Sequence, residues 1–296
     1  MKATLVLPAR DEQDCIEAVI DEATAHFHGL IVVVDNGSTD ATAERARSAG
    51  ATVVQEHVAG YGRACMAGVV AAGDSDVFVF MDADGSDCPS DIPALLAEIE
   101  GGAAIALGVR TGDRVEPGAI TLPARFGNWL SGALIGLWTG RRLQDLSPLK
   151  AITREALSEI GPTEMTYGWT VELLAVAASR KMPIAEVETG YRHRMSGQSK
   201  VSGSLSGSFR AGWRILFVLA RVGVKQMQAS TVGGLAGAII GIAGLGTYTL
   251  WLFLQAPASR DVLVSSWLLA WPLLLLGVLL GMVAASVLAR GKRART

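Results

Sequence analysis

The sequence predicts an α/β fold in which a mostly parallel sheet carries helices on both of its faces. Two observations support this prediction. Residues 1–110 repeat one unit of apolar strand, polar turn and helix, and the strands are nearly continuous runs of Val, Ile and Leu, as expected for strands buried on both faces. Each strand also ends in polar residues, and open parallel sheets bind ligands at the carboxyl ends of their strands. The sequence therefore predicts a ligand site along one edge of this sheet.

The elements are predicted in the following order. A first strand at 4–8 precedes a helix, because apolar residues recur there at helical spacing, namely Ile16, Val19, Ile20, Ala23 and Phe27. The alternation of strand and helix continues at 30–35, 42–48, 51–55, 61–72, 77–81, 92–99 and 104–109. Residues 111–200 are less regular and are predicted to hold a helix at 126–138, two more helices and a strand at 184–191. No G-x-G-x-x-G motif follows the first strand, which disfavours a dinucleotide-binding fold.

Charge is divided unevenly along the 296 residues. Residues 1–200 carry 17 Lys and Arg against 27 Asp and Glu, a net charge of −10, whereas residues 201–296 carry nine against one, a net charge of +8. The strongly negative charge of residues 1–200 argues against nucleic-acid binding, which requires a basic surface. The three cysteines, Cys15, Cys65 and Cys88, show neither metal-ligand spacing nor the even number of a disulfide framework. A reducing compartment is therefore expected.

The C-terminal part predicts a membrane anchor. No charged residue occurs in 226–259 or in 262–289, and each run exceeds the roughly 20 apolar residues that a helix needs to cross a bilayer. Membrane spans are therefore predicted at about 231–254 and 263–288. Of the nine Lys and Arg in residues 201–296, eight lie outside the hairpin that these two spans would form. Because positively charged flanks of membrane spans stay in the cytoplasm, the N-terminal domain and both termini are predicted to be cytoplasmic. The membrane is predicted to be the inner (plasma) membrane. The alternative is a helical hairpin buried in a large soluble core.

These patterns divide the chain into three predicted parts: a globular domain at 1–203, an amphipathic helix at 204–225, and the hairpin with its basic tail at 226–296. In the amphipathic helix, apolar residues follow helical spacing and a neighbouring face carries Arg210, Arg214, Arg221 and Lys225. Directly before a membrane span, this pattern is typical of a helix that lies in the membrane interface. A core helix of the globular domain is the alternative. The N-terminus runs straight into a strand, so no signal peptide is expected.

The most informative motif is Asp82-Ala83-Asp84, which directly follows the apolar run 77–81. Side chains two apart on an extended chain point the same way, so both carboxylates can share one cation and the phosphates that it holds. Proteins usually bind Mg²⁺ through one or two carboxylates plus substrate phosphates. The motif therefore predicts a site for Mg²⁺ or Mn²⁺ with Asp82 and Asp84 as ligands. A solvated acidic turn is the alternative.

Five short motifs occur in order along the chain: Pro8-Ala9-Arg10-Asp11-Glu12, Val34-Asp35-Asn36-Gly37-Ser38-Thr39-Asp40, Gly60-Tyr61-Gly62, Met81-Asp82-Ala83-Asp84-Gly85 and Gly197-x-Ser199-Lys200. Together they resemble the inverting family-2 glycosyltransferases with the A-type nucleotide-sugar fold, in particular the branch similar to dolichyl- and polyprenyl-phosphate sugar synthases. The resemblance covers about residues 1–225. It implies that the protein transfers a hexose from a nucleotide sugar to polyprenyl phosphate on the cytoplasmic face of a membrane.

The resemblance also implies roles for individual residues. The nucleotide-sugar pocket would be lined by Pro8, Ala9, Arg10, Glu12, Asp35, Gly62, Asp82 and Ala83. Asp35 would recognise the base or the ribose. Asp82 and Asp84 would bind the cation, which neutralises the charge that develops on the departing nucleoside diphosphate. Asp145 aligns with the family's acidic residue beside the acceptor and would act there as a base or would orient the acceptor. A helix cap is the alternative for Asp145.

Three cations would hold the acceptor phosphate. Arg192, Arg194 and Lys200 come just before the predicted interfacial helix, and Arg is suited to bidentate phosphate contact. General attraction to an anionic leaflet is the alternative. Ser86 stands where mannosyl synthases of this branch often carry Gln, and the order Asp-Gly-Ser favours UDP-glucose over GDP-mannose as the donor.

Two alternative functions remain open. One is transfer to a hydroxyl-bearing lipid, which would need Asp145 as a true base. The other is a non-catalytic, membrane-tethered protein that binds nucleotide sugars. The sequence leaves open the sugar, the prenyl chain length, the pathway and the oligomeric state, with a homo-oligomer among the possibilities.

Overall fold

The computed structural model describes residues 1–196, 217–219, 221 and 222. The chain divides into two compact units, Met1–Val222 and Gly223–Thr296, and all described residues belong to the first. Within the described part of the chain, no helix combines the length and the apolar character needed to cross a bilayer. The predicted hairpin and most of the predicted interfacial helix lie outside the described residues.

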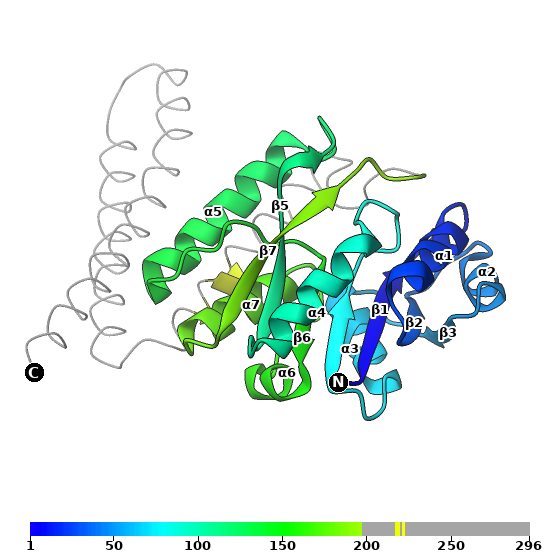
Figure 1. The fold of residues 1–296 in the computed structure, drawn as a ribbon, viewed down its shortest axis with the longest axis horizontal. Helices are drawn as coiled ribbons and strands as arrows, with labels where there is room; N and C mark the ends of the chain where they lie inside the picture. Colours follow the sequence, from blue (N-terminus) through cyan, green and yellow to red (C-terminus); the bar gives the residue numbers. More distant parts are fainter. Residues whose placement is uncertain (197–216, 220, 223–296) are drawn as a thin grey trace, which may run out of the picture. The chain divides into compact units, whose positions relative to one another are not determined.

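A mixed, mostly parallel sheet of seven strands lies at the centre of the described unit, in the order β3-β2-β1-β4-β6-β5-β7 (Figure 1). The strands are β1 (Ala3–Ala9), β2 (Leu30–Asp35), β3 (Thr52–Gln55), β4 (Val77–Phe80), β5 (Ile105–Val115), β6 (Lys150–Thr153) and β7 (Ile184–Tyr191). Parallel pairs join β1 to β2 and β4, β2 to β3, and β5 to β7. Only β6 runs antiparallel to its neighbours β4 and β5 within this described sheet. The predicted mostly parallel sheet is therefore confirmed.

The helices cover both faces of the sheet, as predicted. They are α1 (Ile16–His26), α2 (Thr42–Ser48), α3 (Tyr61–Ala71), α4 (Ile92–Glu100), α5 (Leu122–Thr139), α6 (Arg154–Ile160) and α7 (Trp169–Ser179), with a short 3₁₀ turn at Pro89–Asp91. Side chains alternate between the two faces of a strand. Leu5 and Leu7 of β1 accordingly share a core with residues of α1 and α4. On the other face, Val6 of β1 lies against Gly68 of α3.

The central strand β6 was not predicted, and the sequence indicated only a loop and a helix in this region. The strand has four residues, too few for a period-two pattern, and it begins with a charged residue, Lys150. Its pairing is nevertheless extensive, because it fills the gap between β4 and β5. Strand β5 is also longer than predicted and extends to Val115 alongside β7.

Part of the predicted interfacial helix is described and contacts the globular unit. Val218, Leu219 and Val222 are buried there, whereas Phe217 is exposed. Arg221 forms an ion pair with the buried Glu172 of α7, with an Nη2–Oε1 distance of 2.6 Å. These described residues therefore pack against the globular domain, and the rest of the predicted helix at 204–225 lies outside the described residues.

Candidate functional site

A pocket of about 450 Å³ lies where β1, β2 and β4 end. Most of the predicted site residues that the structure describes line it, namely Pro8, Ala9, Arg10, Glu12, Asp82, Ala83, Asp84 and Arg194. Parallel strands β2, β1 and β4 are neighbours in the sheet, so the loops after their carboxyl ends converge. The predicted residues Asp35, Gly62, Asp145 and Arg192 do not line the pocket, and Lys200 lies outside the described residues.

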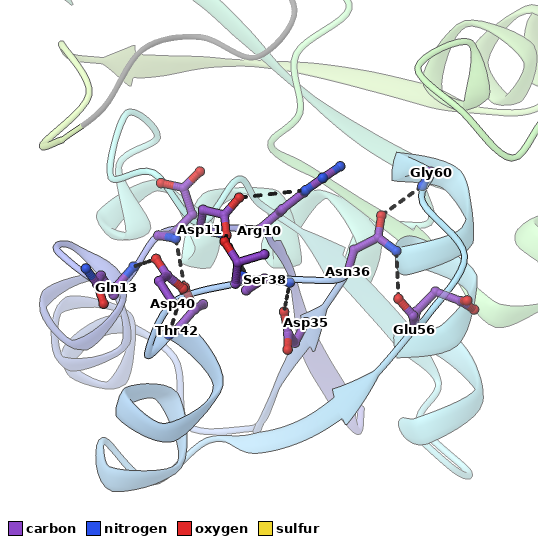
Figure 2. Close-up of polar contacts among 12 residues, drawn as sticks. Arg10, Asp11, Gln13, Asp35, Asn36, Ser38, Asp40, Thr42, Glu56 and Gly60 are labelled. Carbon is purple, nitrogen blue, oxygen red and sulfur yellow. Dashed lines mark hydrogen bonds and ion pairs between the residues drawn. The ribbon is translucent and has the colours of Figure 1, made fainter.

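The loops after β1 and β2 are tied together by reciprocal hydrogen bonds (Figure 2). The backbone N–H of Asp11 donates to Oγ of Ser38 at 3.0 Å, and the carboxylate of Asp11 accepts from the N–H of Thr39 at 2.7 Å. Asp11 has a φ of 49°, a conformation that is uncommon for a residue other than glycine. These bonds hold Asp11 in that conformation and fix the chain beside Arg10 and Glu12.

Asn36 organises the next part of the wall, a role that sequence analysis did not assign. Its Oδ1 accepts from the N–H of Gly60 at 2.8 Å, and its Nδ2 donates to the Glu56 carbonyl at 2.9 Å (Figure 2). The same Nδ2 donates to the Val58 carbonyl at 2.9 Å. Asn36 lines the pocket directly. The preceding Asp35 is buried, and its Oδ1 accepts from the N–H of Ser38 at 2.9 Å.

Gly60 and Gly62 allow another segment to lie against the start of α3. A Cβ on Gly62 would come within 2.7 Å of the Glu164 carbonyl oxygen, and one on Gly60 within 2.4 Å of the Met165 carbonyl oxygen. The N–H of Arg63 donates to the same Met165 carbonyl at 3.1 Å. Gly62 therefore has a packing role in this structure, whereas Gly60 lines the pocket.

Asp82 and Asp84 lie in different environments. Oδ1 of Asp84 accepts from the N–H of Ser86 at 2.9 Å and from its hydroxyl at 2.5 Å, and Oδ2 forms an ion pair with Arg194 at 2.7 Å. The N–H of Asp82 donates to the buried Asp87 at 3.1 Å. Burial and the nearby charge of Asp84 raise the pKa of Asp82 to about 6. The pKa of Asp87 rises to about 8 because of burial and of Asp82.

The residues at this point fit a divalent cation shared with a phosphate. Among the described residues, no group of three or more His, Cys, Asp and Glu is arranged to hold a metal by itself. Asp82 and Asp84 both line the pocket, and the Arg194 guanidinium supplies a positive charge at Oδ2 of Asp84. Two carboxylates facing a space open to a ligand are the protein donors that Mg²⁺ uses together with substrate phosphates.

Asp145 is buried, does not line the pocket and accepts several hydrogen bonds. Its Oδ2 accepts from Nε of Arg110 at 2.7 Å and from the Arg110 backbone N–H at 3.1 Å. Its Oδ1 accepts from Nη2 of Arg110 at 2.9 Å, from Nδ2 of Asn128 at 2.8 Å and from the N–H of Leu146 at 2.8 Å. Asn128 and Leu146 line the pocket. Asp145 therefore reaches the ligand site through its neighbours.

The two predicted phosphate-binding arginines are placed differently. The backbone N–H of Arg192 donates to the Ser86 carbonyl at 2.9 Å, its Nε donates to the Gly85 carbonyl at 2.7 Å, and its guanidinium pairs with Glu22. Arg192 thus fastens the chain after β7 to the loop after β4. Arg194, two residues later, reaches the pocket.

Sequence analysis also missed Lys150, the charged residue of β6. Lys150 is fully buried. Its Nζ donates to the Pro148 carbonyl at 2.7 Å and lies 5.6 Å from the ring centroid of Trp169. Burial lowers the pKa of Lys150 to about 8. The signal in the sequence was a lone Lys within an otherwise apolar stretch, which usually marks a paired or functional charge.

Comparison with known proteins agrees with this geometry. Residues 4–161 match the family model for glycosyl transferase family 2. An uncharacterised glycosyltransferase of Mycobacterium tuberculosis is 37% identical over 223 residues, which cover 72% of this chain and 97% of that protein. A dolichyl-phosphate hexose transferase of Haloferax volcanii is 34% identical over 208 residues, or 69% of this chain and 88% of that protein.

A solved structure is also similar. Glucosyl-3-phosphoglycerate synthase from Mycobacterium tuberculosis, in complex with Mn²⁺, UDP and glucosyl-3-phosphoglycerate, has a TM-score of 0.60 and 28% sequence identity. The similarity covers 75% of this chain and 79% of that one.

Proposed function

Because the chain belongs to glycosyl transferase family 2 and is a hexosyltransferase, we propose that it moves glucose from UDP-glucose to polyprenyl phosphate at a membrane surface. The observation that carries the proposal is the pocket in which Asp82 and Asp84 face the same space as Arg10 and Arg194. Such a pocket offers two carboxylates for a cation and two guanidinium groups for phosphates. The similar synthase was solved with UDP and Mn²⁺, which supports a uridine nucleotide and a divalent cation.

The metal requirement belongs to the same proposal. Asp82 and Asp84 would hold Mg²⁺ or Mn²⁺, and the bound cation would supply neutralisation of the charge on the departing nucleoside diphosphate. The chain's own residues orient the donor. Asn36 fixes the turn at Gly60, and the bonds between Asp11 and Ser38 fix the loop that carries Arg10.

The environment of Asp145 favours an acceptor that is already ionised. A carboxylate has about four lone-pair sites, and five N–H groups already donate to Asp145. No site is left to take a proton from an attacking hydroxyl. A phosphate oxygen is anionic and needs positioning rather than deprotonation. This supports polyprenyl phosphate over a hydroxyl-bearing lipid, for which Asp145 would have to act as a base.

The outer side of α5 supports a lipid acceptor. Leu122, Phe126 and Trp129 follow helical spacing there, and they are 79%, 62% and 53% exposed. The same helix lines the pocket through Asn128 and Ser131. Exposed apolar side chains gathered on one stripe usually mark a contact with a partner or a membrane. A hydrocarbon tail leaving the pocket over α5 would cover this stripe.

The test is an activity assay with the purified full chain in lipid vesicles. UDP-glucose, GDP-mannose and other radiolabelled nucleotide sugars are supplied with polyprenyl phosphate, with the corresponding polyprenol, or with diacylglycerol. We expect transfer from UDP-glucose to polyprenyl phosphate only. Transfer to polyprenol or diacylglycerol at an equal rate would support the hydroxyl-acceptor alternative. Binding of a nucleotide sugar with no transfer to any acceptor would support the non-catalytic alternative.

A further inference from the structure

The pocket has three chemically different walls. One is made by the loops after β1, β2 and β3, with Arg10, Asn36 and Gly60. A second contains Asp82, Asp84 and Arg194, the residues that would hold the cation and a phosphate. The third comes from α5, the loop 146–148 and the segment 166–171. Under the proposed function, the first two walls take the nucleoside and the diphosphate, so the third faces the hexose.

The third wall suits a neutral ligand that carries hydroxyl groups. Its lining residues in the described part of the chain are all uncharged, and its polar members are Asn128, Ser131, Thr166, Tyr167 and Thr170. A phosphate would need cations or an array of N–H donors. Hydroxyl and amide side chains are donors and acceptors at once, which matches the hydroxyl groups of a sugar.

Asn128 is the best-defined group on this wall, because Asp145 fixes its orientation. The carboxylate of Asp145 can only accept hydrogen bonds, so the amide nitrogen of Asn128 must be the atom that faces it, at 2.8 Å. The carbonyl Oδ1 and the second N–H of the amide are then left for another partner. A side-chain amide held this way presents one acceptor and one donor, the pair that two adjacent hydroxyl groups require.

The support behind Asn128 is rigid. Asp145 is held by two parallel bonds from Arg110, and both of their side chains are only 8% exposed. The Arg110 guanidinium also lies over the ring of Tyr191, 4.8 Å from its centroid. Ser131, three residues after Asn128 and therefore on the same side of α5, is 2% exposed and makes no side-chain hydrogen bond to the described residues.

We propose that Asn128, with Ser131 beside it, binds hydroxyl groups of the transferred hexose, and that Asp145 is the positioning residue that orients Asn128. This assignment rests on the proposed function. Under this assignment, residues of α5 determine which sugar is preferred, and the loops after β1, β2 and β3 do not. It also gives Asp145 a role that needs no proton transfer.

The test compares the binding of UDP with that of UDP-glucose by calorimetry, using the full chain in detergent with Mn²⁺. Asn128→Ala removes the amide, and we expect about a tenfold weaker affinity for UDP-glucose, the effect of one or two lost hydrogen bonds. The affinity for UDP should not change, which also shows that the variant is folded. Gln144→Ala is the matched control, because it removes an exposed amide next to Asp145. The control should bind both ligands as the wild type does.

Deoxy analogues of UDP-glucose identify the hydroxyl group concerned. One analogue should bind the wild type about tenfold more weakly than UDP-glucose does, because the amide of Asn128 is left unpaired in that complex. The same analogue and UDP-glucose should bind Asn128→Ala equally. Ser131→Ala should likewise bind UDP-glucose and a deoxy analogue equally, but for an analogue that lacks a hydroxyl group at a different position of the ring.

Two further measurements test whether Asp145 acts by positioning Asn128: UDP-glucose affinity in a double variant and the pH dependence of kcat. Asp145→Asn should weaken UDP-glucose binding, and adding Asn128→Ala to it should weaken binding no further, because both changes remove one interaction. The pH dependence of kcat should keep its shape in Asp145→Asn, whereas loss of a general base would remove its acidic limb.

Three outcomes would overturn the inference. The first is unchanged UDP-glucose affinity in Asn128→Ala, and the second is an equal loss for UDP and UDP-glucose. The third is an altered acidic limb in Asp145→Asn. Wild-type protein that binds no uridine nucleotide would overturn the proposed donor as well, so that failure is distinguishable from a failure of Asn128 alone.

Discussion

At the residue scale, the two carboxylates of the Asp82-Ala83-Asp84 motif differ in their hydrogen-bond partners and in their pKa. Both oxygens of Asp84 have partners, Ser86 on one side and Arg194 on the other. Asp82 instead has a pKa raised to about 6, because it is partly withdrawn from solvent and lies beside Asp84. The fixed geometry of Asp84 makes it the residue on which cation binding should depend most.

We therefore expect Asp84→Asn to lower turnover about a hundredfold or more, because the lost charge leaves the diphosphate less neutralised. The amide still accepts from Ser86, so the loop should keep its shape. Turnover and the thermal midpoint are measured together. Full wild-type activity in excess chelator would contradict the metal requirement.

The two arginines after β7 offer a second residue-scale test. Arg194 lines the pocket, whereas Arg192 is bonded to the Gly85 carbonyl and to Glu22. Arg194→Ala should raise the KM for polyprenyl phosphate about ten- to a hundredfold, the effect of a lost hydrogen bond to a charged group of about 1.5–3 kcal/mol. Arg192→Ala is the control and should lower stability while leaving that KM nearly unchanged. The reverse result would mean that Arg192 is the acceptor ligand.

At the scale of elements, close backbone approach decides how α3 sits in the fold. A Cβ at Gly62 would meet Glu164 and Met165 backbone atoms at 2.7 and 2.9 Å, whereas one at Gly127 in α5 would meet no atom within 4 Å. Gly62→Ala should thus lower the free energy of unfolding by about 1–3 kcal/mol through overpacking. Gly127→Ala should raise it by about 0.5–1 kcal/mol, because alanine favours a helix interior. Denaturant or thermal unfolding of the two variants checks both signs.

Helix α5 carries a second element-scale prediction, since its outer stripe is apolar and its inner side lines the pocket. The double variant Phe126→Ser/Trp129→Ser should lower transfer to polyprenyl phosphate in vesicles and leave UDP-glucose binding unchanged. The two rings contact each other, with centroids 5.9 Å apart, so they are changed together. Unchanged transfer in vesicles would show that the stripe does not contact lipid.

At the scale of the whole molecule, the open proposal is topology. The positive-inside rule places both termini in the cytoplasm and the turn between the two uncharged runs outside. An impermeant thiol reagent applied to intact cells should label Ser259→Cys and should not label Ala294→Cys. Two of the three native cysteines, Cys15 and Cys65, are buried, which limits background labelling. Labelling of Ala294→Cys alone would mean the opposite orientation.

The parallel half of the sheet followed from the sequence because its signals are local. Strands such as β2 are continuous apolar runs, and the buried positions Ile16, Val19 and Ile20 of α1 follow helical spacing. The motif residues that line the pocket, such as Arg10 and Asp82, could be predicted for the same reason. They stand directly after strands whose carboxyl ends must meet at one edge.

Tertiary structure decided what local patterns do not encode. Strand β6 exists because β4 and β5 need a partner between them, and it brings Lys150 into the core. Asn128 meets Asp145 because α5 and the loop before β6 pack together, 17 residues apart in sequence. Arg194 meets Asp84 because the chain after β7 runs along the loop after β4. The sequence alone thus determined which residues stand at strand ends, since that depends on neighbours along the chain. Long-range pairing determined which side chains contact one another across the pocket, because it depends on how all the strands are ordered in the sheet.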